Sequence, residues 1–205
     1  MHHQLSPTTD SFEAKLVQKA IGRLNYLALH TRPEITFTTK VLSQFAYNPT
    51  TIHWGLGKHL ILNLNGIHNL GILFSKYQGN HNCELVGWED SYYGTSQLTN
   101  KSISGTIIMF YNNSMTWSTK KQPVVAQSTT KAKFIAINWV AKQSRWTTNL
   151  MLSMGLMIHE PTICNENSGA IIISKEVHLN PNSKYIEIIF QYVQELVRNK
   201  LWTMR

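Results

Sequence analysis

Residues 116–151 read TWSTKKQPVVAQSTTKAKFIAINWVAKQSRWTTNLM, and within this stretch the hydrophobic pattern changes from that of a strand to that of a helix. A strand is predicted over 115–118. The longest predicted helix follows over 128–151, with Ser128 or Thr129 as its N-cap. Six residues share the apolar face of this helix: Ala132, Ile135, Ala136, Trp139, Val140 and Leu150.

Further strands and helices flank this segment on both sides. Upstream, strands are predicted over 85–88 and 106–111, and Asn112 and Asn113 suit a hairpin turn because asparagine tolerates positive φ. The downstream predictions are a strand and two helices: 162–165, 168–175 and 186–197. The order β-β-β-α-β-α-α predicts a layered α/β domain.

The residues before this domain predict a small, mainly helical segment. Helical spacing of apolar residues covers 11–29 and recurs twice more before the Gly66 break. A short strand is predicted over 70–74. The polar start, 1–10, is expected to be disordered, and a turn-rich stretch is expected to separate a helical segment of 11–75 from a domain of 84–205.

The charge of the chain is strongly positive and unevenly distributed. The 205 residues include 19 Lys and Arg against 11 Asp and Glu, which gives a net charge of +8. The stretch 91–159 contains no acidic residue, and it holds seven Lys and Arg interleaved with aromatic residues. Such a stretch suits a polyanionic partner such as nucleic acid, although a solvated cationic face is an equally good interpretation.

Composition also argues against several other classes of protein. No apolar run is long enough to cross a bilayer, and the start lacks the apolar core of a signal peptide. Cys83 and Cys164 lie far apart, which favours two free thiols and an intracellular location. The histidines show no zinc-ligand spacing, and no phosphate-binding glycine motif is present.

Four blocks, in order, resemble signatures of copia-type retrotransposon Pol polyproteins. The block AIGRLNYLALHTRPEITFTTKVLSQFAYNPTTIHW (20–54) is similar to the family's AIGSLMYLA-TRPDI-F-LSRF-NPT-HW. TWSTKKQPVVAQSTTKAKFIA (116–136) resembles SWSSKKQP-VALSSTEAEYIA. NSGAIIISK (167–175) resembles DNQGAIALAK, and SKYIEIIFQYVQELV (183–197) resembles TKHIDIRYHFIRELV. Because order and spacing are kept over most of the chain, the resemblance is far more specific than a single motif.

This resemblance implies the end of a reverse transcriptase followed by an RNase H-like domain with a mixed sheet and flanking helices. It also implies hydrolysis of the RNA strand of RNA–DNA hybrids, with two Mg²⁺ ions held by four carboxylates. Magnesium prefers hard oxygen ligands in octahedral geometry, and two ions activate the attacking water and stabilise the leaving oxygen. In this family the polyprotein continues through another strand and a helix, so the domain is expected to be truncated.

The resemblance places the first family carboxylate at Asp90, because GWEDSYYGT (87–95) matches GYSDADWAG. The second, the Glu of the TEAEY motif, matches Lys133, and the earlier Glu of that motif matches Lys131. An ammonium cannot ligate Mg²⁺ and places positive charge beside the ions. Asp90 alone is also typical of a turn at a strand end, and Lys133 of a solvated helix.

The other two family carboxylates match glutamates. Glu166 takes the third position if one extra residue follows the cysteine of CNENSGAI, and Glu187 takes the fourth, in KYIEI. Glutamate keeps the charge but sets it one methylene further from the backbone, which displaces it in a site that needs accurate geometry. Since both positions lie near helix N-termini, stabilisation of the helix dipole explains them equally well.

A cationic loop is a second candidate site. We expect five residues beside a groove to contact phosphates: Ser118, Thr119, Lys120, Lys121 and Gln122. An ordinary polar loop is the alternative interpretation.

Three functions are compatible with this sequence. The first is a degenerate, catalytically impaired piece of a copia-type Pol polyprotein, an RNase H-type hydrolase by resemblance, whose Mg²⁺ site is spoiled. The second is a non-enzymatic nucleic-acid-binding module that keeps the basic surface. The third is an active RNA–DNA hybrid ribonuclease rearranged around Asp90, Glu166, Glu187 and Glu89.

Overall fold

A computed structural model describes residues 11–76, 84–94, 99–156, 158–175, 184–199 and 203–204. The chain divides into two compact units, Met1–Ile72 and Leu73–Arg205, and each is described here by itself. The predicted disordered start, 1–10, and most of the predicted linker lie outside the described residues. No described helix combines the length and the apolar character that crossing a membrane requires.

The first unit is helical, as its apolar spacing predicts. It consists of α1 (Ser11–His30), a 3-10 turn (Pro33–Ile35), α2 (Thr36–Ser43) and α3 (Thr51–Gly66). Its buried residues come from all of these elements: Val17, Ile21, Leu24, Ala28, Ile35, Leu42 and Leu60. Four of them lie on α1 at helical spacing, so α1 supplies most of this core.

The strand predicted over 70–74 is wrong. These residues have no strand hydrogen bonding, and Leu70, Leu73 and Phe74 are 60%, 85% and 66% exposed. A short apolar run becomes a strand only when a sheet edge is available to pair with it and to cover its side chains. Its apolar residues pack against neither of the two buried clusters.

The second unit is built on a five-stranded mixed sheet with the order β3-β2-β1-β4-β5. The three long strands are antiparallel neighbours: β1 (Leu85–Tyr92), β2 (Ile103–Phe110) and β3 (Asn113–Lys121). The two short strands, β4 (Thr162–Cys164) and β5 (Thr203–Met204), run parallel to their neighbours. The mixed sheet with flanking helices confirms the predicted RNase H-like fold class.

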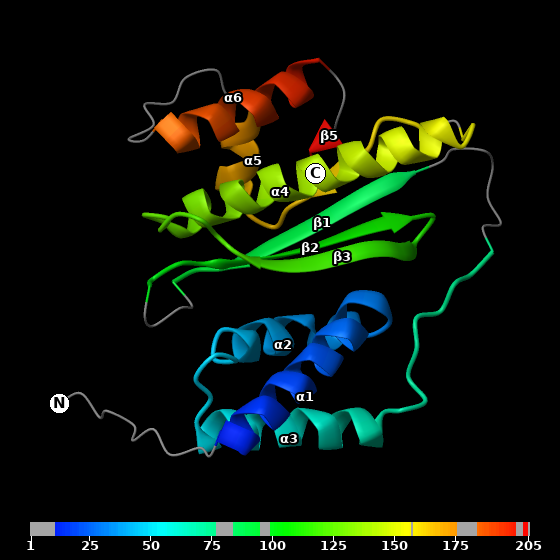
Figure 1. Ribbon diagram of the computed structural model, residues 1–205. Coiled ribbons are helices and arrows are strands. Elements are labelled where there is room, and N and C mark those ends of the chain that lie inside the picture. The colour runs from blue at the N-terminus through cyan, green and yellow to red at the C-terminus, as the bar shows by residue number, and fades with distance from the viewer. Residues whose placement is uncertain are drawn as a thin grey trace. The chain divides into compact units, whose positions relative to one another are not determined.

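Three helices lie together on one side of this sheet (Figure 1): α4 (Thr129–Ser153), α5 (Ser168–Lys175) and α6 (Lys184–Arg198). Ser128 caps α4, because its hydroxyl accepts a hydrogen bond from the Lys131 backbone N–H at 3.1 Å. The predicted helix is therefore confirmed with its cap. Its buried face packs on Leu85, Ile108 and Ile163 of the sheet.

Gly87 lets β1 lie directly beneath α4. A Cβ at this position would lie 2.7 Å from Val140 Cγ2 and 3.1 Å from the Ser144 hydroxyl, both on α4. Any larger residue would push the helix away from the strand, so glycine here sets how closely the two elements approach. The first half of β1 is thereby held under the middle of α4.

The β2–β3 hairpin turns one residue earlier than predicted. Phe110 pairs with Asn113, and the two turn residues are Tyr111 and Asn112, with φ of 50° and 61°. Two consecutive positive φ values suit the right-handed twist of the flanking strands. Asn112 is in the turn as predicted, but Asn113 belongs to β3 and Tyr111 takes the other left-handed position.

Candidate functional site

Two of the predicted site residues come to the same end of the sheet. Strands β1 and β4 are parallel, and Trp88 pairs with Cys164. Asp90 and Glu166 each lie two residues beyond this pair, and both side chains are exposed. The carboxyl ends of adjacent parallel strands open onto one edge, which is where ligands bind in open α/β sheets.

Lys133 projects from the first turns of α4 to this edge. Its ammonium lies 3.1 Å from Asp90 Oδ1, and the lysine side chain is 20% exposed against 77% for the aspartate. The neighbouring Lys131 does not join them, because its ammonium donates to the Gln127 side chain at 2.7 Å. Lys133 therefore places a cation directly on Asp90.

Glu89 lies on the opposite side of β1 from Asp90, beneath α4, and it is only 7% exposed. Neither carboxyl oxygen has a hydrogen-bond partner among the described residues. Burial raises the pKa of Glu89 to about 8; the Lys133 charge opposes this rise and the Asp90 charge adds to it. Glu89 therefore keeps its proton at neutral pH, although sequence reasoning gave it only a secondary role.

At the end of β4 the buried side chain is Asn165, not Glu166. Asn165 is 8% exposed, and its Oδ1 accepts from the Asn167 backbone N–H at 2.5 Å. Asn167 in turn accepts from the Ala170 backbone N–H at 2.8 Å and caps α5. The end of β4 therefore carries a buried amide, and the carboxylate of Glu166 lies in solvent.

Glu187 lies in the first turn of α6, but its side chain falls outside the described part of the structure. Among the residues that are described, no group of three or more His, Cys, Asp or Glu is arranged to hold a metal ion. The donors at this edge do not fit Mg²⁺, because the Lys133 ammonium is already paired with Asp90 Oδ1 and cannot itself ligate the ion.

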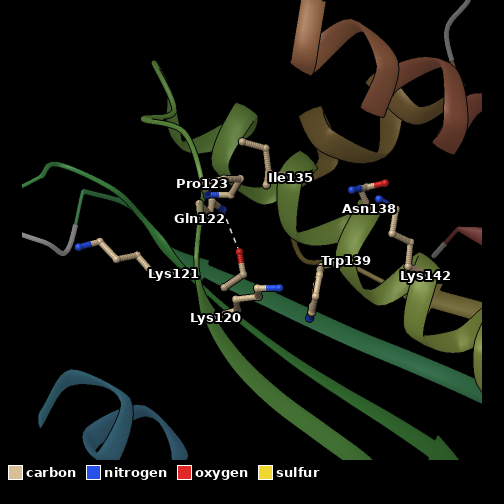
Figure 2. A pocket seen from close by; sticks show the side chains of 9 residues that line it. Lys120, Lys121, Gln122, Pro123, Ile135, Asn138, Trp139 and Lys142 are labelled. Carbon is tan, nitrogen blue, oxygen red and sulfur yellow. Dashed lines mark hydrogen bonds between the residues drawn. The ribbon is translucent and has the colours of Figure 1, made fainter. Parts of the chain in front are cut away.

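The predicted phosphate-contacting loop belongs to the end of β3. Ser118 Oγ accepts from Trp139 Nε1 at 3.0 Å and from Gln143 Nε2 at 3.1 Å, so it is engaged with α4. Gln122 is buried and donates to Ser104 Oγ and to the Ala132 carbonyl, each at 2.8 Å. Both side chains hold the loop against α4. Figure 2 shows Lys120 and Lys121 leaving this anchored segment in different directions.

Comparison with known proteins finds similar sequences among transposon polyproteins. The chain is 27% identical over 198 residues, 95% of its length, to the retrovirus-related Pol polyprotein from transposon TNT 1-94 of Nicotiana tabacum. It is 27% identical over 180 residues to the Pol polyprotein from transposon RE2 of Arabidopsis thaliana, which covers 87% of the chain. It spans only 15% and 12% of the lengths of these two polyproteins.

Other comparisons are more limited. Over 129 residues the chain is 30% identical to secreted RxLR effector protein 161 of Plasmopara viticola, which covers 63% of the chain and 89% of that protein. LC11-RNase H1, solved in complex with an RNA/DNA hybrid, matches 59% of this chain and 83% of its own at 10% identity, with a TM-score of 0.42. A likeness this loose carries no argument about the site. No family model matches the chain.

Proposed function

We propose that this chain, which belongs to the copia-type retrotransposon Pol polyproteins, is a piece of such a polyprotein whose RNase H-like unit binds nucleic acid without hydrolysing it. The ancestral reaction is hydrolysis of RNA in RNA–DNA hybrids. In this chain the carboxylate set that the reaction requires is broken at its second position.

The observation that carries this proposal is the ion pair between Lys133 and Asp90. Two divalent cations concentrate four positive charges between carboxylates, and a resident ammonium raises the cost of bringing them there. The same ammonium uses an oxygen of Asp90 that a metal would need. Glu89 does not compensate, because its raised pKa keeps it protonated at neutral pH.

Nucleic-acid binding is supported by the charge of the second unit. The acid-free stretch 91–159 covers β2, β3 and α4, so its cationic residues gather on neighbouring elements. Phosphate neutralisation by lysine and arginine releases counterions, and binding of this kind weakens steeply as salt rises.

Incubation with an end-labelled RNA–DNA hybrid tests both parts of the proposal. With Mg²⁺ or Mn²⁺ we expect no more cleavage by the natural chain than by Asp90→Asn, because the metal site is already lost. Hybrid binding should fall as salt increases, in both proteins.

Two results would count against this function. Cleavage clearly above that of Asp90→Asn would favour an active ribonuclease rearranged around Asp90, Glu166 and Glu187. Hybrid binding that does not respond to salt would remove the case for a nucleic-acid binder. Lys133→Glu adds a further comparison, because a large gain of cleavage identifies the ammonium as the cause of inactivity.

A further inference from the structure

A second cationic site lies away from the Asp90–Lys133 pair, in a cavity of about 180 Å³ between the end of β3 and α4 (Figure 2). Polar and apolar side chains share its walls: Lys120, Pro123, Ile135, Asn138, Trp139 and Lys142. None of the described residues that line it is acidic. We refer to it as the Lys120–Lys142 pocket.

The two lysines that name the pocket are held by aromatic rings. Lys120 Nζ lies 3.7 Å from the centre of the Trp139 ring, and Lys142 Nζ lies 5.8 Å from that of Tyr192. In the part of the chain that the structure describes, neither ammonium forms an ion pair with a carboxylate. A ring positions an ammonium but does not neutralise it, so both charges remain available to an anion.

Trp139 is itself fixed in place. Its indole N–H donates to Ser118 Oγ at 3.0 Å, and Ser118 also bonds to Thr106 at 2.8 Å. The indole therefore cannot swing away without breaking a hydrogen bond to β3. This anchoring gives the exposed Lys120 a fixed ring to rest on beside the pocket.

Asn138 supplies a third polar group and has no structural explanation of its own. It is 5% exposed, and its side-chain oxygen is buried without a hydrogen-bond partner among the described residues. Figure 2 shows its amide nitrogen on the side that faces Ile135 and Trp139. The unpaired oxygen is an acceptor and does not attract an anion, so the amide nitrogen is the group of Asn138 that can donate to an oxyanion.

We propose that the Lys120–Lys142 pocket binds a phosphate group. Lys120, Lys142 and Asn138 line it, and two ammonium groups with an amide N–H suit an oxyanion. The cavity is below the ~300–1,000 Å³ typical of pockets for larger ligands, which fits one phosphate and excludes a whole nucleotide. Only the source of the phosphate, a nucleic-acid strand, rests on the proposed function.

Titration with inorganic phosphate, followed by NMR of the tryptophan indole N–H groups, tests the pocket directly. The Trp139 resonance is assigned as the one missing in Trp139→Phe, and it should shift saturably in the natural chain. Lys120→Gln and Lys142→Gln should each weaken phosphate binding about tenfold, since each removes a charge-assisted hydrogen bond. Lys120→Arg should retain binding, and Asn138→Asp should abolish it by repulsion.

Lys19→Gln is the matched control, because Lys19 is exposed on α1 and its loss changes the net charge equally. Equal weakening by Lys19→Gln, or a shift that never saturates, would overturn the pocket in favour of diffuse attraction. Short single strands with and without a 5′-phosphate then show which phosphate of a strand enters the pocket. Equal affinity for the two strands indicates internal phosphates, and tighter binding of the 5′-phosphorylated strand indicates strand ends. Hybrid cleavage reports on Asp90 and not on this pocket, so the two proposals fail separately.

Discussion

Replacing Glu89 by glutamine is expected to stabilise the second unit above about pH 8, by an amount on the order of 5 kcal/mol. In the unfolded chain this carboxyl loses its proton near pH 4.5, whereas in the folded chain it keeps the proton to about pH 8. Between these values the folded state binds the extra proton, so the stability contributed by Glu89 is complete below pH 4.5 and lost as pH rises through 8. Glutamine removes this dependence.

Urea unfolding of the full chain across this pH range measures the effect. Tryptophan fluorescence reports mainly on the second unit, which holds five of the six tryptophans. Glu195→Gln on α6 is the control, because it removes the same charge from an exposed position. Curves of stability against pH that run parallel for the natural chain and Glu89→Gln would show that the buried carboxyl is not protonated.

Replacing Phe134 by alanine is expected to lower the free energy of unfolding by about 3–5 kcal/mol. Phe134 on α4 is 1% exposed and stacks on Phe190 of α6, with 4.0 Å between the ring centres. Its loss leaves a cavity at the contact that joins these helices. Phe134→Leu keeps most of the volume and should cost less than about 1.5 kcal/mol.

The same urea experiment measures this effect. Ile188→Ala is the comparison, because Ile188 is 57% exposed on α6 of the same unit and loses less buried surface. A loss for Phe134→Ala no larger than for Ile188→Ala would mean that α6 does not pack on α4 in solution.

Local pattern was enough to predict most of the fold. The period of α4 and the capping hydroxyl of Ser128 act within a few residues, so both are readable in the sequence. The Tyr111–Asn112 turn was displaced by one residue because the pairing of Phe110 with Asn113 selects the turn, and asparagine preference alone does not. The prediction of a strand over 70–74 was wrong because this apolar run has no strand to pair with. Whether such a partner is present depends on the fold and not on the run itself.

The candidate sites depended more on tertiary contacts. Family resemblance identified Asp90 and Lys133, but their 3.1 Å contact required the placement of α4 over β1. The burial of Glu89 could have been predicted from the alternation of buried and exposed residues along β1, since Glu89 follows Leu85 and Gly87 on the buried face. The place of Asn138 and Lys142 in a pocket could not be predicted from the sequence, because only the packing of α4 on β3 brings them beside Lys120.

The central claim is that the Lys133 ammonium excludes divalent metal from Asp90. Manganese is paramagnetic and broadens the NMR signals of nearby amides, so titration of the ¹⁵N-labelled chain with Mn²⁺ tests this claim most directly. We predict that the amide signals of Glu89 and Asp90 stay sharp in the natural chain and broaden in Lys133→Glu at the same Mn²⁺ concentration. Selective broadening of the Asp90 signal in the natural chain would contradict the account.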